Sequence, residues 1–353
     1  MNRPLLSRRE VLKRAKAFAL VIPGLSLAAC GRENPADRLT EFTGATMGTT
    51  YTVQVTDLPN RVGRDALHAD IHRILKTVNT RMSTYQVDSE LSRFNASTST
   101  GWFPLSTDTL EVLAEALRVS RLCGGAFDVT VGPLVNLWGF GPPMRSALPP
   151  SDGQIRDALE RVGFMNIEIR TSPPAVRKHH PGMYIDLSGI AKGYGLDKVT
   201  EHLDHSNIGH YLVEIGGELR GRGHNPRGET WKIAIEKPLA GQRAIYRVAH
   251  LQNGVLATSG DYRNYFEKDG RRFAHIIHPR TGQPITHDLA SVTVIGQSAM
   301  SADALATALM VLGTDAGFHL AKRENLAAFF VVKDGKRFVE MSTPAFERHL
   351  VPL

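Results

Sequence analysis

The stretch YIDLSGIAKGYGLD, residues 184–197, combines a short apolar segment, an acid, three glycines and a lysine among small residues. Glycines beside a lysine are typical of a backbone that comes close to phosphate groups. The stretch contains neither G-x-x-x-x-G-K-[ST] nor G-x-G-x-x-G, so the two best-known phosphate loops are excluded. The rest of the chain has to indicate which ligand it holds.

Composition and charge describe an ordinary globular protein. The chain has 353 residues, 42% of them hydrophobic and 22% charged, which is enough for one large domain or two smaller ones. Of its 42 Lys and Arg and 35 Asp and Glu residues, six bases and one acid lie in the first 30 positions. The remaining 36 bases and 34 acids nearly balance, so nucleic acid is not an expected partner.

The basic N-terminus indicates export. SRREVLK, residues 7–13, resembles a twin-arginine signal, and the apolar run that follows ends in LAAC, which resembles a bacterial lipobox. We predict a signal peptide at residues 1–29, a lipid anchor on Cys30, a tether over 30–42 and one domain over 43–353. The protein would then be an exported, membrane-anchored bacterial lipoprotein that faces the periplasm or the cell exterior. Export through the Sec pathway, or a buried N-terminal helix, is the alternative.

Hydrophobic periodicity predicts an α+β fold. Helical spacing of apolar residues marks residues 65–82, 109–123, 151–163, 194–203, 301–313 and 314–323. Strand patterns include residues 50–55, 183–187, 254–260 and 290–296. Because the strands come in hairpin-like groups rather than strict βαβ alternation, we predict mixed, mainly antiparallel sheets with packed helices, in two interleaved lobes.

Two further segments carry candidate chemistry. SADALATALMVLG, residues 301–313, places Asp303 and Thr307 on one helix face, with Ser301 as the expected N-cap. A carboxylate and a hydroxyl one turn apart suit Mg²⁺, although an acid in a first helical turn also offsets the helix dipole. HIIHPRTGQPI, residues 275–285, is a rigid turn in which a histidine can act as a base or an orienting group.

These segments together resemble a known family. The others are MGTTY (47–51), MSTY (82–85), GGAFDVTVGPLV (124–135) and LATSGDYRNYF (256–266). In register from about residue 43 to the C-terminus, they resemble the FAD:protein FMN transferase (ApbE) family. The resemblance implies an ApbE-like fold and Mg²⁺-dependent transfer of FMN from FAD to a Thr or Ser hydroxyl of a target flavoprotein, with release of AMP.

The resemblance also implies the site residues. The FAD contacts fall on Met47, Tyr85, Ala126, Phe127, Asp128, Asp186, Lys192 and Ile277. The metal ligands fall on Asp303, Thr307 and the backbone carbonyl of Gly189. His278 stands where the family usually has an acid, and its role stays open. The implied acceptor is a flavoprotein subunit of a respiratory or electron-transfer complex.

A physical interpretation of the opening stretch follows. Gly189 lets its carbonyl face the metal, Lys192 neutralises the pyrophosphate as a point charge, and Asp186 accepts a hydrogen bond from the flavin or ribityl group. The glycines are expected to leave room for a bulky dinucleotide. His275 is the candidate base that activates the acceptor hydroxyl. The alternatives are a Mg²⁺-dependent FAD pyrophosphatase giving FMN and AMP, and a non-catalytic FAD-binding lipoprotein.

Overall fold

The computed structural model describes residues 38–142, 149–239, 244–262, 264–268 and 270–352. The predicted signal peptide (1–29), Cys30 and residues 31–37 of the predicted tether lie outside these residues. The first strand begins at Leu39, inside the predicted tether, so the predicted domain start at residue 43 is too late. Residues 39–42 belong to the sheet because they pair in antiparallel register with residues 53–56 of the next strand.

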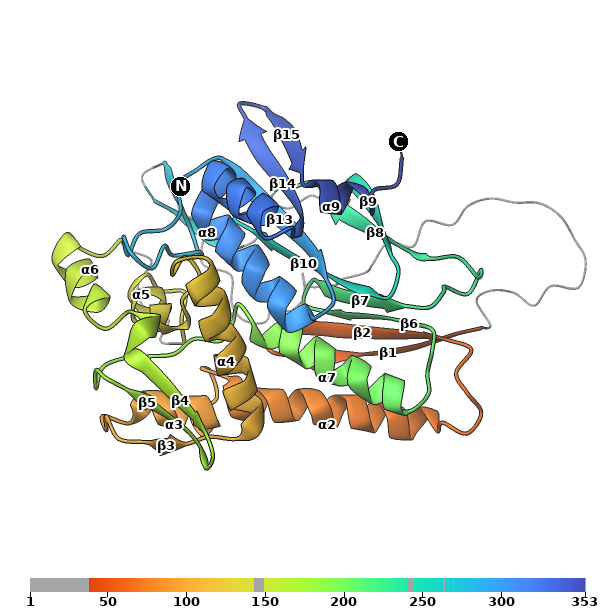
Figure 1. Ribbon diagram of the computed structural model, residues 1–353, viewed down its shortest axis with the longest axis horizontal. Helices are drawn as coiled ribbons and strands as arrows, with labels where there is room; N and C mark the ends of the chain where they lie inside the picture. The colour runs from red at the N-terminus through yellow and green to blue at the C-terminus, as the bar shows by residue number, and fades with distance from the viewer. Residues whose placement is uncertain (1–37, 143–148, 240–243, 263, 269, 353) are drawn as a thin grey trace, which may run out of the picture.

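One antiparallel sheet of eight strands forms the larger lobe (Figure 1). Its strands run in the order β1 (Leu39–Thr46), β2 (Thr49–Thr56), β6 (Tyr211–Ile215), β7 (Glu218–Arg222), β10 (Gly254–Gly260), β13 (Leu289–Gly296), β14 (Ala327–Asp334) and β15 (Arg337–Ser342). Each strand pairs with its neighbour in antiparallel register, as the hairpin-like grouping in the sequence predicted.

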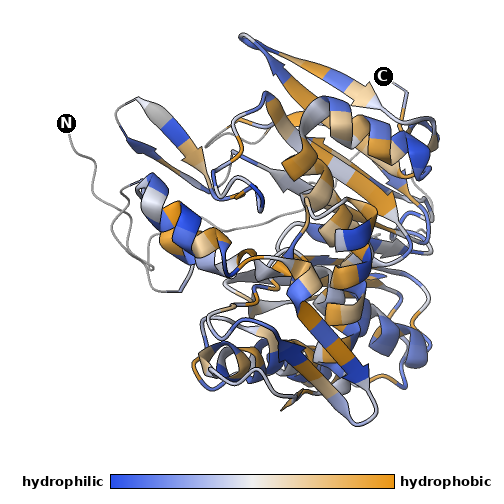
Figure 2. Cartoon of the chain, turned by 60° about the vertical axis from the view of Figure 1, so that its left-hand side comes forward, coloured by the Kyte–Doolittle hydropathy of each residue, from blue (hydrophilic) through white to orange (hydrophobic). Residues whose placement is uncertain are grey.

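Both faces of this sheet are covered. The main core lies under α2 (Arg64–Met82), α7 (Ala191–His205) and α8 (Ala299–Arg323). The hairpin β8 (Trp231–Glu236) and β9 (Ile245–Leu251), with α9 (Pro344–Glu347), covers a second apolar cluster. Figure 2 shows apolar residues concentrated along the strands and on the helices that pack on them. Helix α8 is long and apolar enough to cross a membrane, but it packs against β10, β13 and α7 as a core helix.

The smaller lobe is inserted between β2 and β6. It contains the sheet β3 (Phe103–Pro104), β5 (Pro174–Lys178) and β4 (Ile167–Thr171), with α3 (Glu90–Ala96) and α4 (Thr107–Leu122). A third apolar cluster joins α5 (Gly132–Leu137) and α6 (Asp152–Leu159) to the hairpin β11 (Tyr265–Lys268) and β12 (Arg271–Ala274). The predicted α+β class, with mainly antiparallel sheets and two interleaved lobes, is confirmed.

Four local predictions are wrong. Residues 183–187 form no strand, and the predicted loop after residue 82 contains α3. Helix α7 begins at Ala191, before the predicted start at 194. Helix α8 begins at Ala299 with Ser298 as its N-cap, because the hydroxyl of Ser298, rather than that of Ser301, accepts a hydrogen bond from the helix. The break predicted after residue 313 is present at Gly313, where φ is 77°.

Candidate active site

The apolar segment before the glycines alternates between buried and half-buried residues, and a side chain holds it instead of a neighbouring strand. The N–H of Ile185 donates to Oδ1 of Asn95, and Nδ2 of Asn95 donates to the carbonyl of Ile185, each at 2.8 Å. The N–H of Asp186 donates to the carbonyl of Val129 at 2.7 Å. Buried backbone groups need such partners. The amide of Asn95 therefore takes the place of a neighbouring strand and fixes the start of the stretch.

The three predicted metal residues converge where α7 meets α8. A side-chain carbon added at Gly189 would lie 3.4 Å from Oγ1 of Thr307 and 3.2 Å from the ring of Phe127. Asp303, one turn before Thr307, is 3% exposed, and Oγ1 of Thr307 lies 3.2 Å from Oγ of Ser259. A carboxylate, a hydroxyl and a carbonyl are hard donors that fit Mg²⁺. In the described ranges no three His, Cys, Asp or Glu side chains converge as a metal site.

Lys192 lies against the same carboxylate. Its Nζ is 3.2 Å and 3.3 Å from the two oxygens of Asp303, 3.1 Å from the carbonyl of Ser188 and 3.7 Å from Oε1 of Glu218. Burial on its own lowers the pKa of Lys192, but Asp303 and Glu218 outweigh it and raise that pKa above its usual value. Burial raises the pKa of Glu218 to about 8, against the pull of Lys192. The site therefore keeps a lysine cation at neutral pH.

Two of the three glycines, Gly193 and Gly195, allow close packing against other parts of the chain. A side-chain carbon at Gly193 would lie 2.2 Å from the carbonyl oxygen of Ala299, so only glycine lets α7 approach the start of α8 this closely. The N–H of Gly193 then donates to Asp303 at 3.2 Å. A carbon at Gly195 would lie 3.1 Å from Met47. The expectation that these glycines leave room for a dinucleotide is wrong for both, because the protein fills that space.

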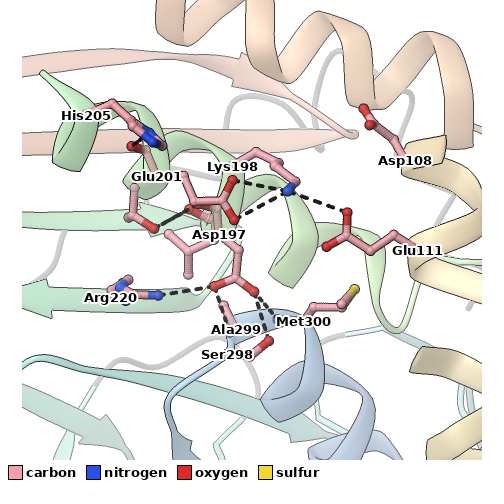
Figure 3. Close-up of polar contacts among 12 residues, drawn as sticks. Asp108, Glu111, Asp197, Lys198, Glu201, His205, Arg220, Ser298, Ala299 and Met300 are labelled. Carbon is pink, nitrogen blue, oxygen red and sulfur yellow. Dashed lines mark hydrogen bonds and ion pairs between the residues drawn. The ribbon is translucent and has the colours of Figure 1, made fainter. Parts of the chain in front are cut away.

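Asp197, the last residue of the stretch, caps the helix that carries Asp303 (Figure 3). Its carboxylate accepts hydrogen bonds from the N–H groups of Ala299 and Met300 at 2.9 and 3.0 Å, and from the hydroxyl of Ser298 at 3.0 Å. Arg220 lies 3.3 Å away on the other side. A negative charge at a helix N-terminus is favourable. Asp197 therefore fixes the entry of α8 from outside that helix.

Replacing Asp197 with alanine is expected to lower the free energy of unfolding by about 2 to 3 kcal/mol, since several hydrogen bonds to a charged group at a helix start are lost. Chemical denaturation measures the change. Glu201→Ala is the matched control, because Glu201 lies one turn on and pairs at the surface with Lys198. That control should change stability by less than about 0.5 kcal/mol. Equal losses in both variants would show that Asp197 is an ordinary surface acid.

The residues predicted to contact FAD lie in different environments. Ala126 and Phe127 are buried, and the ring of Phe127 lies beside Gly189, whereas Tyr85 is 54% exposed on the loop after α2. Both carboxylate oxygens of Asp128 accept hydrogen bonds within the chain, from Thr130 and from the N–H of Phe164. Asp128 therefore orders the loop through both of its carboxylate oxygens. The side chain of Ile277 packs in the third apolar cluster, which leaves its backbone for any ligand.

His275 has the tautomer that a base requires. Its Nδ1 lies 2.9 Å from the carbonyl oxygen of Asn264. A carbonyl only accepts, so Nδ1 carries the proton and Nε2 keeps its lone pair. Burial lowers the pKa of His275, and the nearby charge of Lys192 acts in the same direction. The ring is therefore neutral and basic near pH 7.

His278 faces a different environment from His275. Its Nδ1 accepts a hydrogen bond from the N–H of Arg280 at 3.1 Å, which stabilises the turn. The residue lines a cavity of about 780 Å³ together with Trp138, Lys268 and His287. None of the predicted FAD or metal residues lines that cavity. The side chain of His278 therefore stabilises this turn.

Three residues at the site were not predicted. Glu218 reaches Lys192 from the start of β7, Ser259 contacts Thr307 from β10, and Asn95 holds Ile185 from α3. Ser259 lies in a segment that was singled out, and Glu218 follows a Gly-Gly pair after an alternating strand. The sequence therefore drew attention to both segments, but nothing in it indicated that Ser259 or Glu218 in particular belongs to the site. Asn95 has no such signal.

The chain is similar to several known proteins in sequence and in structure. The model of the ApbE family matches residues 47–330. A Haemophilus influenzae protein named FAD:protein FMN transferase is 46% identical over 341 residues, covering 95% of this chain and 98% of that protein. The solved flavin transferase ApbE from Vibrio cholerae is 44% identical with a TM-score of 0.83, over 88% of this chain and 99% of that one. The ApbE protein of Thermotoga maritima is 28% identical with a TM-score of 0.80, over 89% and 100%.

Proposed function

We propose that this chain, which belongs to the ApbE family, is an FAD:protein FMN transferase that uses Mg²⁺ to move FMN from FAD onto a Thr or Ser hydroxyl of a flavoprotein, with release of AMP. One observation supports this most directly. Gly189, Asp303 and Thr307 offer three hard oxygen donors beside the ammonium of Lys192, as a pyrophosphate with a bound metal requires.

In the proposed reaction, the acceptor hydroxyl oxygen forms a bond to the FMN phosphorus while the bond from that phosphorus to the bridging oxygen of AMP breaks. Mg²⁺ supplies charge neutralisation to the pyrophosphate. Lys192 adds a positive charge beside the pyrophosphate. Nε2 of His275 accepts the hydroxyl proton, for which the Asn264 contact already sets the tautomer.

The same residues would serve a FAD pyrophosphatase, with water in place of the hydroxyl. Tyr85, exposed at the rim, is the proposed cover over the flavin that favours a protein acceptor over water. A non-catalytic FAD carrier would have no use for an oriented base or for a second carboxylate around Lys192. The acceptor we propose is a flavoprotein subunit of a respiratory or electron-transfer complex.

An assay with FAD, Mg²⁺ and a candidate acceptor separates these functions. A transferase releases AMP and leaves the acceptor fluorescent on a denaturing gel. Release of both AMP and FMN without a fluorescent acceptor would identify a pyrophosphatase instead. FAD binding without release of AMP would identify a carrier and contradict the proposal.

We also propose that the protein is exported and held at the membrane by a lipid on Cys30, on the basis of the SRREVLK and LAAC segments. Changing Cys30 to serine is expected to block lipidation, so the protein should appear as an unprocessed or soluble form. Fractionation of cells and gel mobility measure this. Cys123→Ser is the control, because that thiol is buried in the folded domain. Unchanged membrane association in the Cys30 variant would contradict the anchor.

A further inference from the structure

Lys192 occupies a position that the proposed metal would also need. Its ammonium lies 3.2 and 3.3 Å from the two oxygens of Asp303, and 3.1 Å from the carbonyl of Ser188, the residue before Gly189. Carboxylate and carbonyl oxygens are the donors that Mg²⁺ prefers. The lysine side chain therefore already satisfies, with one charge, the carboxylate that a divalent ion would bind.

The carboxylate of Glu218 is a second possible partner for the ammonium of Lys192. Glu218 is 3% exposed, and its Oε1 is 3.7 Å from Nζ of Lys192. Its Oε2 is buried without a hydrogen-bond partner among the residues that the structure describes. A buried carboxylate oxygen without a donor is unfavourable. Glu218 can therefore accept a closer contact than the one it has.

The stem of Lys192 passes the turn that precedes Glu218. A side-chain carbon added at Gly216 would lie 3.2 Å from Cδ of Lys192, so the lysine stem lies against the turn between β6 and β7. Any larger residue at that position would press on the stem. The flexible lysine stem allows its end group to move while its backbone stays in α7.

We propose that Lys192 is the resident cation of the metal site, and that a divalent ion bound at Asp303 displaces its ammonium onto Glu218. This inference rests on the proposed function, since it takes Asp303 as a metal ligand. A lysine ammonium and a divalent ion on one buried carboxylate repel each other strongly in a medium of low dielectric constant, which favours the exchange. Glu218 is then a positioning residue, which acts on metal binding only through Lys192.

The test measures Mn²⁺ affinity of the full-length protein without FAD, by calorimetry. Lys192→Met is expected to bind Mn²⁺ about tenfold more tightly or better, since no cation has to leave Asp303. At a pH above about 8, where Glu218 is ionised, Glu218→Gln should bind Mn²⁺ about tenfold more weakly, because the displaced ammonium loses its charged partner. The double variant should match Lys192→Met alone, since Glu218 has no effect without the lysine.

Three results would overturn the exchange. These are unchanged or weaker binding in Lys192→Met, unchanged binding in Glu218→Gln, and a Glu218→Gln loss that persists in the double variant. Asp303→Ala distinguishes the metal site from the proposed exchange. Mn²⁺ binding that survives this change refutes the metal site itself, whereas loss of Mn²⁺ binding leaves only the exchange in question. If a variant fails to fold, a crystal structure of the unaltered protein with Mn²⁺ decides. Nζ within hydrogen-bond distance of Glu218 supports the exchange, and Nζ still on Asp303 overturns it.

Discussion

Asp303→Ala is expected to lower flavin transfer by more than about a hundredfold. It removes the only carboxylate among the predicted metal ligands, and even changes to residues behind metal ligands typically cost about 10- to 100-fold. Asp303 also accepts a hydrogen bond from the N–H of Gly193, which the alanine variant loses, while the close approach of Gly193 to Ala299 remains. Transfer rates over a range of Mg²⁺ concentrations, with FAD affinity measured in the absence of metal, test the prediction.

Thr307 provides the graded comparison. Thr307→Ala removes a neutral ligand, so transfer should fall less and more Mg²⁺ should be needed to reach the maximum. Thr307→Ser keeps the hydroxyl beside Ser259 and should restore the Mg²⁺ requirement. FAD affinity without metal should change little in any of these variants. If Asp303→Ala keeps full transfer at low Mg²⁺, the metal lies elsewhere.

The part of the site that lies within one helix could be predicted from sequence. Asp303 and Thr307 are four residues apart, and α-helical geometry alone places them on one face. Their contact with Gly189 depends on how closely α7 approaches α8, which Gly193 permits against Ala299. The family resemblance indicated Gly189, but the spacing in the sequence carries no such information. Tertiary packing determines this distance.

Glu218 could not be recognised because its partner is distant in the chain. It begins β7, directly after the Gly216–Gly217 turn, and an acid at that position is usually a solvated turn residue. Only the pairing of β6 with β7 brings it to Lys192 at the start of α7. A pattern of residue types describes local conformation, whereas this ion pair depends on the order of strands in the sheet.

The false strand at residues 183–187 has a related cause. An alternating apolar pattern predicts a strand, and alternate residues of this segment are buried in the structure. The pattern does not identify what satisfies its hydrogen-bonding groups. Asn95 does so with one side-chain amide, so no ladder forms. Helix α3, which carries Asn95, has seven residues with Leu91 and Phe94 buried, too few for periodicity to reveal it.

His275→Ala is expected to lower transfer by about 10²- to 10⁴-fold, the usual contribution of a general base. The base works when Nε2 is unprotonated, so the rate should fall as pH drops through the pKa of His275. Because burial lowers that pKa below its usual value of about 6.5, the rate should hold to a lower pH than for an exposed histidine. Rates measured from acid to neutral pH with saturating FAD and Mg²⁺ test this.

The variant should lose the acid limb of the pH profile as well as most of the rate, which a merely structural defect would not produce. His278→Gln is the matched control, since this neighbouring histidine lies in the same turn and lines the separate cavity. It should keep both the rate and the acid limb, because His275 keeps its hydrogen bond to Asn264. An acid limb that persists in His275→Ala and disappears in His278→Gln would assign the base to His278.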